Sequence, residues 1–117
     1  AEVASKPDVA WPLVRVHPTT QRRSLYVNPK NTRRVLERAT GRPPAGWTDA
    51  DGIAFVRALA EKAIRNATYH KWRKGDFVIW DNRMLLHAAT PFDASKYTRF
   101  LFRMEFPGEP VVGADVL

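Results

Sequence analysis

The sequence contains no cysteine in its 117 residues. A disulfide framework, a thiolate zinc site and an iron–sulfur site are therefore excluded. The absence fits a reducing compartment, so we expect a cytoplasmic protein. No apolar run approaches the ~18 residues that a membrane-spanning helix requires, and no signal-peptide pattern opens the chain. We therefore expect no membrane partner.

Acidic residues are also in short supply. They number 12 against 19 Lys and Arg, and the resulting net charge of +7 raises the question of nucleic acid. The excess is uneven: residues 1–47 hold nine basic and three acidic residues, a balance of +6, whereas residues 48–117 hold ten and nine, a balance of +1. The basic segment at residues 22–42 carries no helix-turn-helix, zinc-finger or RNA-recognition signature. We interpret it as a solvated face, with nucleic-acid binding as a less favoured alternative.

The composition, 44% hydrophobic and 26% charged, is that of a globular protein. The length allows at most one domain, so we treat residues 1–117 as a single unit. The clearest predicted element is an amphipathic helix over about residues 51–66, where apolar residues recur at helical spacing. Thr48 and Asp49 are candidates for its N-cap.

Short apolar segments bounded by turn-forming residues predict a mainly β fold with helices. The predicted strands are residues 13–16, 24–27, 68–72, 77–80, 84–87 and 99–106, and a second, short helix is predicted from Asn31 or Thr32 to Arg38. The last strand alternates strictly, with Phe100, Phe102, Met104 and Phe106 on one face and Arg99, Leu101, Arg103 and Glu105 on the other.

Two arginines and one histidine could carry chemistry. Arg99 and Arg103 are four residues apart on a predicted strand, so both point the same way, roughly 13 Å apart along the backbone. Such a face is either solvated or lines a cavity, where two guanidiniums could each hold a carboxylate by a bidentate fork. His87 lies after the apolar strand 77–80 and its turn, and is either a structural residue or a metal ligand. His17 and His70 are weaker candidates.

The joint arrangement of these residues resembles a known family. The order of motifs is similar to the C-terminal half of the taurine dioxygenase/2,4-dichlorophenoxyacetate dioxygenase family. The motifs that carry the similarity are Trp72-Arg-Lys-Gly-Asp76, residues 77–83 with Trp80-Asp-Asn-Arg83, then His87, and Arg99 on an alternating strand. Trp11-Pro-Leu-Val-Arg-Val-His-Pro18 followed by Ser24-Leu-Tyr-Val-Asn28 looks like the segment just after that family's first metal-binding motif. The resemblance covers residues 11–112.

The resemblance implies an iron(II)- and 2-oxoglutarate-dependent oxygenase with a double-stranded β-helix, or jelly roll. Iron(II) in this superfamily is held by two histidines and one carboxylate, which leaves positions for 2-oxoglutarate and oxygen. His87 would be the distal histidine, Arg99 would bind the distal carboxylate of 2-oxoglutarate, and Arg103 would bind an acidic group of a small organic substrate. Tyr26 and Trp80 would lie near the substrate. The phenylalanine face of residues 99–106 would then pack outward against a helix.

The sequence departs from the family in one respect. The other two iron ligands come as His-X-Asp or His-X-Glu, and no histidine here has a carboxylate two residues later. We therefore expect the chain to be the C-terminal part of such a dioxygenase, an incomplete jelly roll that alone binds iron(II) weakly and has no turnover. The alternative is a non-catalytic jelly-roll module that works by binding or association. A homo-oligomer is compatible with the family.

Overall fold

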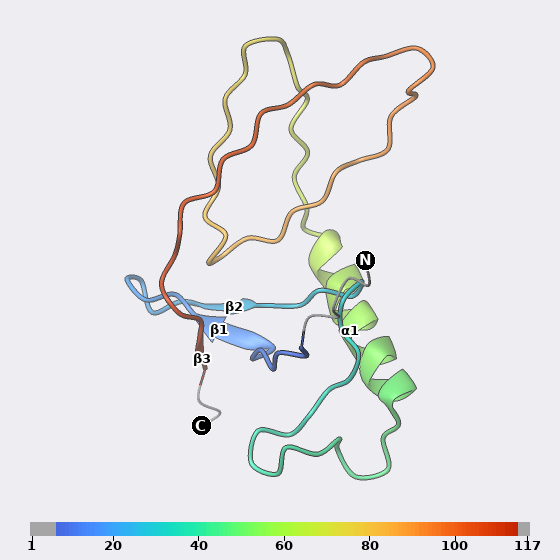
Figure 1. Cartoon of the computed structure of the whole chain (residues 1–117), viewed down its shortest axis with the longest axis vertical. Helices are drawn as coiled ribbons and strands as arrows, with labels where there is room; N and C mark the ends of the chain where they lie inside the picture. Colours follow the sequence, from blue (N-terminus) through green and yellow to red (C-terminus); the bar gives the residue numbers. More distant parts are fainter. Residues whose placement is uncertain (1–6, 115–117) are drawn as a thin grey trace, which may run out of the picture. The chain divides into compact units, whose positions relative to one another are not determined.

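A computed structural model describes residues 7–114 of the chain. The chain divides into two compact units, one of Ala1–Leu25 with Trp80–Leu117 and the other of Tyr26–Ile79. The elements in chain order are strand β1 (Val14–Val16), strand β2 (Arg23–Leu25), helix α1 (Asp49–Ile64) and strand β3 (Val112–Gly113) (Figure 1). No helix among the described residues is long and apolar enough to cross a membrane.

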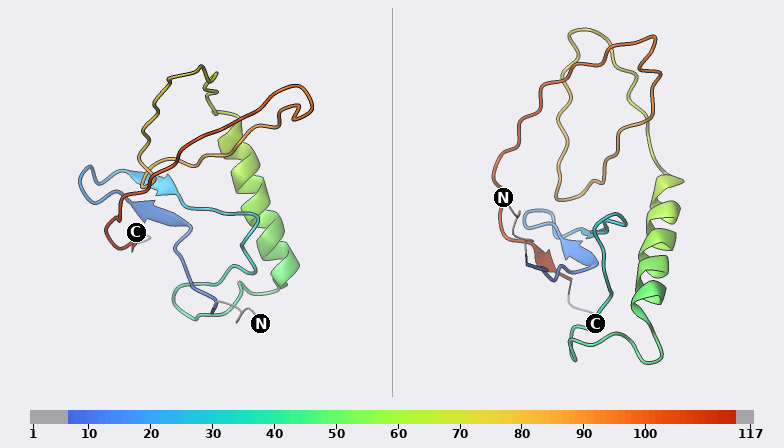
Figure 2. Two further views of the ribbon diagram at one scale, coloured as in Figure 1. Left: turned by 45° about the horizontal axis from the view of Figure 1, so that its top comes forward. Right: turned by 45° about the vertical axis from the view of Figure 1, so that its right-hand side comes forward.

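The first unit is built on a three-stranded antiparallel sheet with the order β2-β1-β3. Strands β1 and β2 form a hairpin in which Arg15 lies opposite Ser24, and the pair is seen side by side in Figure 2. Strand β3 returns from the far end of the sequence and places Gly113 opposite Arg15. A Cβ at Gly113 would lie 3.0 Å from the Pro12 Cβ, so glycine permits this close approach. The predicted strands at 13–16 and 24–27 are confirmed with shifted ends.

The second unit contains helix α1, which confirms the main predicted helix. Thr48 is the N-cap and forms a capping box with Asp51: the Thr48 hydroxyl accepts from the Asp51 backbone, and the Asp51 carboxylate accepts from the Thr48 backbone N–H. The Thr48 hydroxyl also donates to the Asp51 carboxylate, and this bond, together with the one from the Thr48 backbone N–H, lowers the pKa of Asp51. Val56 is fully buried. One turn earlier a Cβ at Gly52 would meet the Val35 backbone nitrogen at 2.9 Å, so only glycine lets residue 35 pack against the helix.

The predicted helix from Asn31 or Thr32 to Arg38 is wrong. Asn28 closes a turn instead: its carbonyl accepts from the Thr32 N–H at 2.9 Å and its side chain accepts from the Lys30 N–H at 3.2 Å. The chain makes a single turn there and does not continue as a helix. The segment has Val35 and Leu36 as adjacent apolar residues and so lacks the apolar stripe that a short helix needs for stability.

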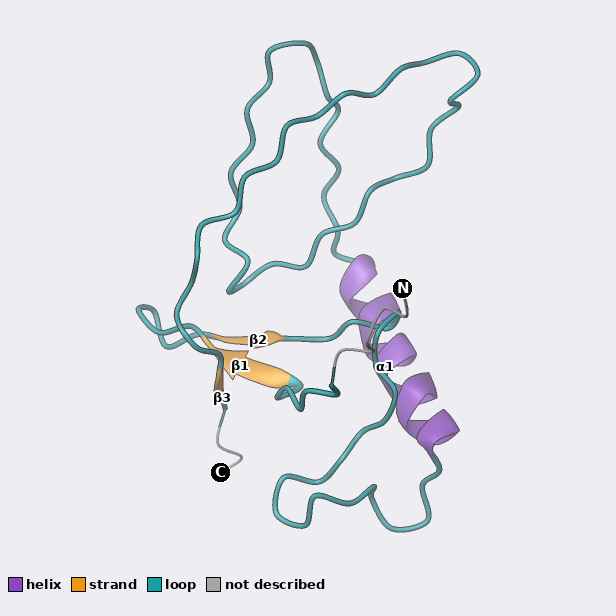
Figure 3. Ribbon diagram, in the orientation of Figure 1, coloured by secondary structure: helices purple, strands orange, loops and turns teal. Residues whose placement is uncertain are grey.

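The later predicted strands, 68–72, 77–80, 84–87 and 99–106, are also not strands in the structure, and residues 65–111 are drawn as loops and turns in Figure 3. A strand forms only where its backbone N–H and C=O groups pair with a neighbour. No such ladder involves these four segments in the described part of the chain. The side chains of Phe102 and Phe106 are 90% and 86% exposed, so the predicted burial of the phenylalanine face is absent as well. Over residues 7–114, the fold observed is therefore one helix and a small antiparallel sheet joined by long loops.

Candidate functional site

A cluster of polar side chains is centred on His17, which directly follows strand β1. The His17 side chain is buried, and its Nε2 lies 3.0 Å from Asp81 Oδ2. Its Nδ1 accepts hydrogen bonds from the backbone N–H groups of Thr19 and Thr20, at 3.2 and 3.0 Å. Because a nitrogen that accepts hydrogen bonds carries no proton, we assign the proton to Nε2, which donates it to Asp81. The imidazole thus joins the hairpin turn to the residue that follows Trp80.

Asp81 is held from a second side by Arg83. The Arg83 Nε donates to Asp81 Oδ1 at 2.9 Å and its Nη2 to Oδ2 at 2.9 Å, which is the bidentate geometry that arginine favours. The Arg83 backbone N–H also donates to Asp81 Oδ1, at 2.8 Å. These bonds from Arg83, with a smaller contribution from His17, hold the pKa of Asp81 far below its ordinary value. Asp81 is therefore a permanent carboxylate at physiological pH.

The turn formed by Asp81, Asn82 and Arg83 is fastened to strands β1 and β2 by its backbone as well. Arg15, which is buried on β1, donates from Nη1 to the Asn82 carbonyl at 3.2 Å. Ser24 on β2 donates from its hydroxyl to the Arg83 carbonyl at 3.2 Å. With the His17–Asp81 contact, three bonds from the hairpin fix this turn. The Trp80-Asp-Asn-Arg83 segment therefore has a defined position relative to the sheet.

His87 lies close to this turn through an aromatic contact. The imidazole and the indole of Trp80 have ring centroids 4.7 Å apart and an interplanar angle of 48°. Neither ring nitrogen of His87 has a hydrogen bond within residues 7–114. By contrast, His17 and His70 each bond a carboxylate, His70 Nε2 lying 2.9 Å from Asp76 Oδ2. His87 is thus the histidine whose lone pair is open to an external ligand.

The two predicted arginines are exposed and have local partners. The Arg99 Nη1 donates to the Thr90 carbonyl at 3.3 Å, and its guanidinium carbon lies 4.3 Å from the centroid of the Phe92 ring. Arg103 forms an ion pair with Glu105. No hydrogen bond, ion pair or ring contact joins His87 to Arg99 or Arg103 in the part of the chain that is described. These partners are weak, because exposed ion pairs and cation–π contacts contribute only about 0.2–1 kcal/mol.

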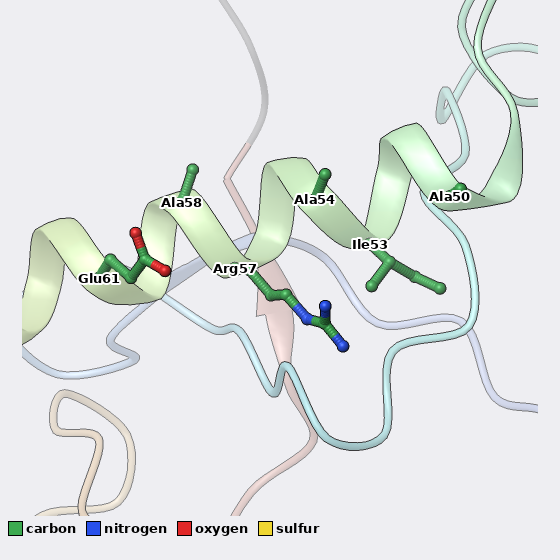
Figure 4. A pocket seen from close by; sticks show the side chains of 6 residues that line it. All are labelled: Ala50, Ile53, Ala54, Arg57, Ala58 and Glu61. Atoms are coloured by element: carbon green, nitrogen blue, oxygen red, sulfur yellow. The ribbon is translucent and has the colours of Figure 1, made fainter.

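Tyr26, the other predicted substrate residue, belongs to the second compact unit and is half-buried. That unit also contains a hollow along helix α1 (Figure 4), lined by Ala50, Ile53, Ala54, Arg57, Ala58 and Glu61. None of the predicted site residues lines it. The basic residues are divided as well, with Arg22 and Arg23 in the first unit and the rest of the segment in the second.

Iron(II) can be tested against the residues that are present. An imidazole with open nitrogens is a suitable ligand for iron(II), and His87 supplies one. Among residues 7–114, however, no group of three His, Asp or Glu side chains could hold a metal ion. The described residues therefore offer His87 as one candidate ligand and no complete facial triad.

The sequence did not reveal the His17–Asp81 pair. In the sequence, His17 is only a weaker candidate for chemistry, and Asp81 appears only within the Trp80-Asp-Asn-Arg83 motif. The available signal was local: His17-Pro18 followed by two threonines is suited to a turn that bonds the ring. Nothing in the sequence shows that the partner of this ring lies 64 residues later.

Comparison with known proteins identifies the family. The family model described as "Taurine catabolism dioxygenase TauD, TfdA family" matches residues 1–104. The chain belongs to this family, which confirms the resemblance drawn from the motifs.

Several curated relatives are similar. The (S)-phenoxypropionate/alpha-ketoglutarate-dioxygenase of Delftia acidovorans is 36% identical over 101 residues, 85% of this chain and 31% of that protein. The alpha-ketoglutarate-dependent 2,4-dichlorophenoxyacetate dioxygenase of Cupriavidus pinatubonensis is 34% identical over 97 residues, 81% of this chain and 30% of that protein. The alkylsulfatase of Acinetobacter baylyi is 32% identical over 117 residues, 98% of this chain and 33% of that protein. The chain thus spans about a third of the length of these relatives. No solved structure matches.

Proposed function

We propose that residues 1–117 form the C-terminal part of an iron(II)- and 2-oxoglutarate-dependent dioxygenase that hydroxylates a small anionic organic substrate. The observation that carries the proposal is His87: in a chain of this family, it alone of the three histidines has both ring nitrogens free of hydrogen bonds within residues 7–114. The names of the relatives, which include a phenoxypropionate and a 2,4-dichlorophenoxyacetate dioxygenase, support an anionic substrate class.

The incomplete domain is part of the same proposal. The relatives are about three times longer than the segment they share with this chain. The exposed apolar side chains of Phe100, Phe102 and Phe106 are those that a further layer of the jelly roll would cover. The backbone of residues 99–106 would then gain the neighbouring strands that it lacks here, because a ladder requires a partner on at least one edge.

Each predicted residue has a distinct task in this mechanism. Iron(II), 2-oxoglutarate and oxygen together supply the oxidation, in which one oxygen atom enters a C–H bond as hydroxyl and the other enters succinate with release of carbon dioxide. His87 would hold the metal through one ring nitrogen. Arg99 would exchange its weak contacts with Thr90 and Phe92 for a bidentate pair with the distal carboxylate of 2-oxoglutarate.

The substrate would be held by Arg103, the next charged residue after Arg99, and by an aromatic side chain. Arg103 would exchange Glu105 for the anionic group of the substrate. Trp80 would contact the organic part of the substrate, since aromatic side chains commonly line small-molecule sites. This set places two guanidiniums on the two anions of the reaction, so each arginine orients one reactant.

The proposal is tested by His87→Ala in the complete dioxygenase, with His70→Ala as the matched control. We expect His87→Ala to abolish iron-dependent succinate formation, because a metal ligand is lost. His70→Ala removes an imidazole that bonds Asp76 and should retain turnover. Unchanged turnover in His87→Ala would overturn the proposal.

The purified 117-residue chain gives a second test. We expect it to bind iron(II) weakly and to show no turnover, since its described residues hold no group of three ligands for a metal ion. Robust 2-oxoglutarate decarboxylation by this chain would contradict the assignment of the missing ligands to another part of the domain. Binding of 2-oxoglutarate by the complete protein without any turnover would instead favour the non-catalytic module.

A further inference from the structure

Within the described residues, the His87 ring makes an aromatic contact with Trp80. The two ring centroids are 4.7 Å apart, and Trp80 is half-buried whereas His87 is exposed. An exposed imidazole without hydrogen bonds is free to sample several side-chain rotamers. A flat indole against one side of the ring removes part of this freedom. Neither His87 ring nitrogen has a hydrogen bond within residues 7–114, so both can still accept a ligand.

The indole is itself held in place. Its Nε1–H, the single polar group of the ring, donates to Asn82 Oδ1 at 2.8 Å. A tryptophan side chain has two rotatable bonds, so a bond at the far edge of the indole fixes the plane of the whole ring. Asn82 therefore determines where the indole surface lies next to His87.

Asn82 belongs to the turn that the hairpin fastens. Its carbonyl accepts from buried Arg15 at 3.2 Å, and its neighbours Asp81 and Arg83 bond His17 and Ser24. These contacts all lie within one compact unit. A continuous series of contacts therefore runs from strands β1 and β2 through the turn to the indole and then to the imidazole.

We propose that Trp80 and Asn82 are positioning residues that orient the His87 imidazole for metal binding. The inference rests on the proposed function, because it takes His87 as the metal ligand. A metal-binding histidine is usually oriented by a hydrogen bond to its second ring nitrogen. In this protein the Trp80 indole, which is held by the Asn82 amide, orients the His87 ring. The His87 side chain then loses its rotamer entropy when the chain folds and not when the metal binds.

The first experiment needs no metal and uses the 117-residue chain. In the unsubstituted chain, nuclear magnetic resonance should show His87 in one predominant side-chain rotamer, with its ring protons shifted upfield by the indole. Trp80→Ala should abolish this shift and average the rotamers. Asn82→Ala should weaken both effects, and Trp80→Phe should partly restore them. Rotamers of His87 that are already averaged in the unsubstituted chain would overturn the inference.

The second experiment measures cobalt(II) affinity, as an air-stable substitute for iron(II), in the complete dioxygenase. Restoring the freedom of one side chain should raise the dissociation constant about threefold to tenfold in Trp80→Ala, and less in Asn82→Ala. Trp72→Ala is the matched control: it removes an indole that also lies 4.7 Å from a histidine, His70, whose partner is Asp76. It should leave the affinity unchanged.

The outcomes separate the two proposals. If His87→Ala abolishes cobalt(II) binding but Trp80→Ala and Asn82→Ala do not change it, the positioning role is wrong and the proposed function stands. If His87→Ala leaves the affinity unchanged, the proposed function fails, whatever the rotamer measurement shows. If Trp80→Ala disrupts folding, Trp80→Phe and Asn82→Ala still decide the question, because each retains most of the apolar packing.

Discussion

The His17 ring carries two separate sets of hydrogen bonds, and substitutions can remove them one at a time. An asparagine at this position can place its Oδ1 near the former Nδ1 and keep the bonds from Thr19 and Thr20, while it loses Asp81. A glutamine can place its Nε2 near the former ring Nε2 and keep Asp81, while it loses the two backbone bonds. An alanine loses both and leaves a buried space.

The size of the effect follows from burial. The His17 side chain is 5% exposed, so groups that bonded it are poorly placed to find water instead. Loss of one hydrogen bond in such a place costs about 1–3 kcal/mol, and loss of all of them with the ring itself should cost about 2–4 kcal/mol in His17→Ala. We expect His17→Asn and His17→Gln to fall between His17→Ala and the unsubstituted chain.

Amide hydrogen exchange is the suitable assay because it reports each bond separately. His17→Gln should increase exchange at Thr19 and Thr20 only. His17→Asn should increase exchange mainly at Met84 and Leu85, whose N–H groups bond the Asp81 carbonyl within the turn. His17→Ala should increase exchange at both places. Uniform protection of the turn in all three variants would refute the view that His17 joins the turn to the hairpin.

Three further predictions concern other parts of the chain. The pKa of Asp81 is lowered in the folded protein, so its bonds stabilise the fold at pH values above about 3.9, the ordinary pKa of an aspartate. This stabilisation is lost as the pH falls below that value. In acid unfolding followed by circular dichroism, the free energy of unfolding should therefore fall more steeply with decreasing pH in the unsubstituted protein than in Asp81→Asn, which lacks this titration; equal slopes would contradict the prediction. Gly52→Ala should destabilise the second unit by up to about 2 kcal/mol in thermal unfolding. Overpacking against the Val35 backbone costs about 1–3 kcal/mol, which exceeds the roughly 1 kcal/mol gain in helix propensity. A stabilised variant would show that residue 35 does not pack there. In the complete dioxygenase, Arg99→Ala should chiefly raise the KM for 2-oxoglutarate and Arg103→Ala the KM for an anionic substrate; an unchanged dependence on the substrate in Arg103→Ala would contradict its assignment.

Local sequence signals predicted the elements whose stability is local. Helix α1 has its N-cap, acidic first turn and apolar spacing within 17 residues, Thr48 to Ile64, and the structure has it there. The β1–β2 hairpin is likewise formed by neighbouring segments. Residues 99–106 have as clear an alternation as any part of the chain, yet a strand depends on partners that the sequence of the strand does not contain. The sequence therefore shows the alternation of side chains in residues 99–106, but not whether a neighbouring strand is present to pair with them.

The candidate site shows the same division. The identity of His87 as a possible ligand followed from the family motif, because residue types at fixed spacing are a sequence property. The ring nitrogens of His87 are open, whereas His17 and His70 each bond an aspartate. This difference depends on hydrogen bonds between residues up to 64 positions apart in the sequence. The contact between Trp80 and His87, and the amide that holds the indole, depend on a turn whose position is set by Arg15 and Ser24 on other strands. Such long-range contacts are not accessible to motif spacing.

We propose above all that His87 binds the iron of a 2-oxoglutarate-dependent dioxygenase. The most direct measurement is the amount of iron(II) bound by the complete protein under anaerobic conditions with 2-oxoglutarate present, compared between the unsubstituted protein, His87→Ala and His70→Ala. We predict stoichiometric iron in the unsubstituted protein and in His70→Ala, and loss of most of it in His87→Ala. Equal iron in all three proteins would contradict the account.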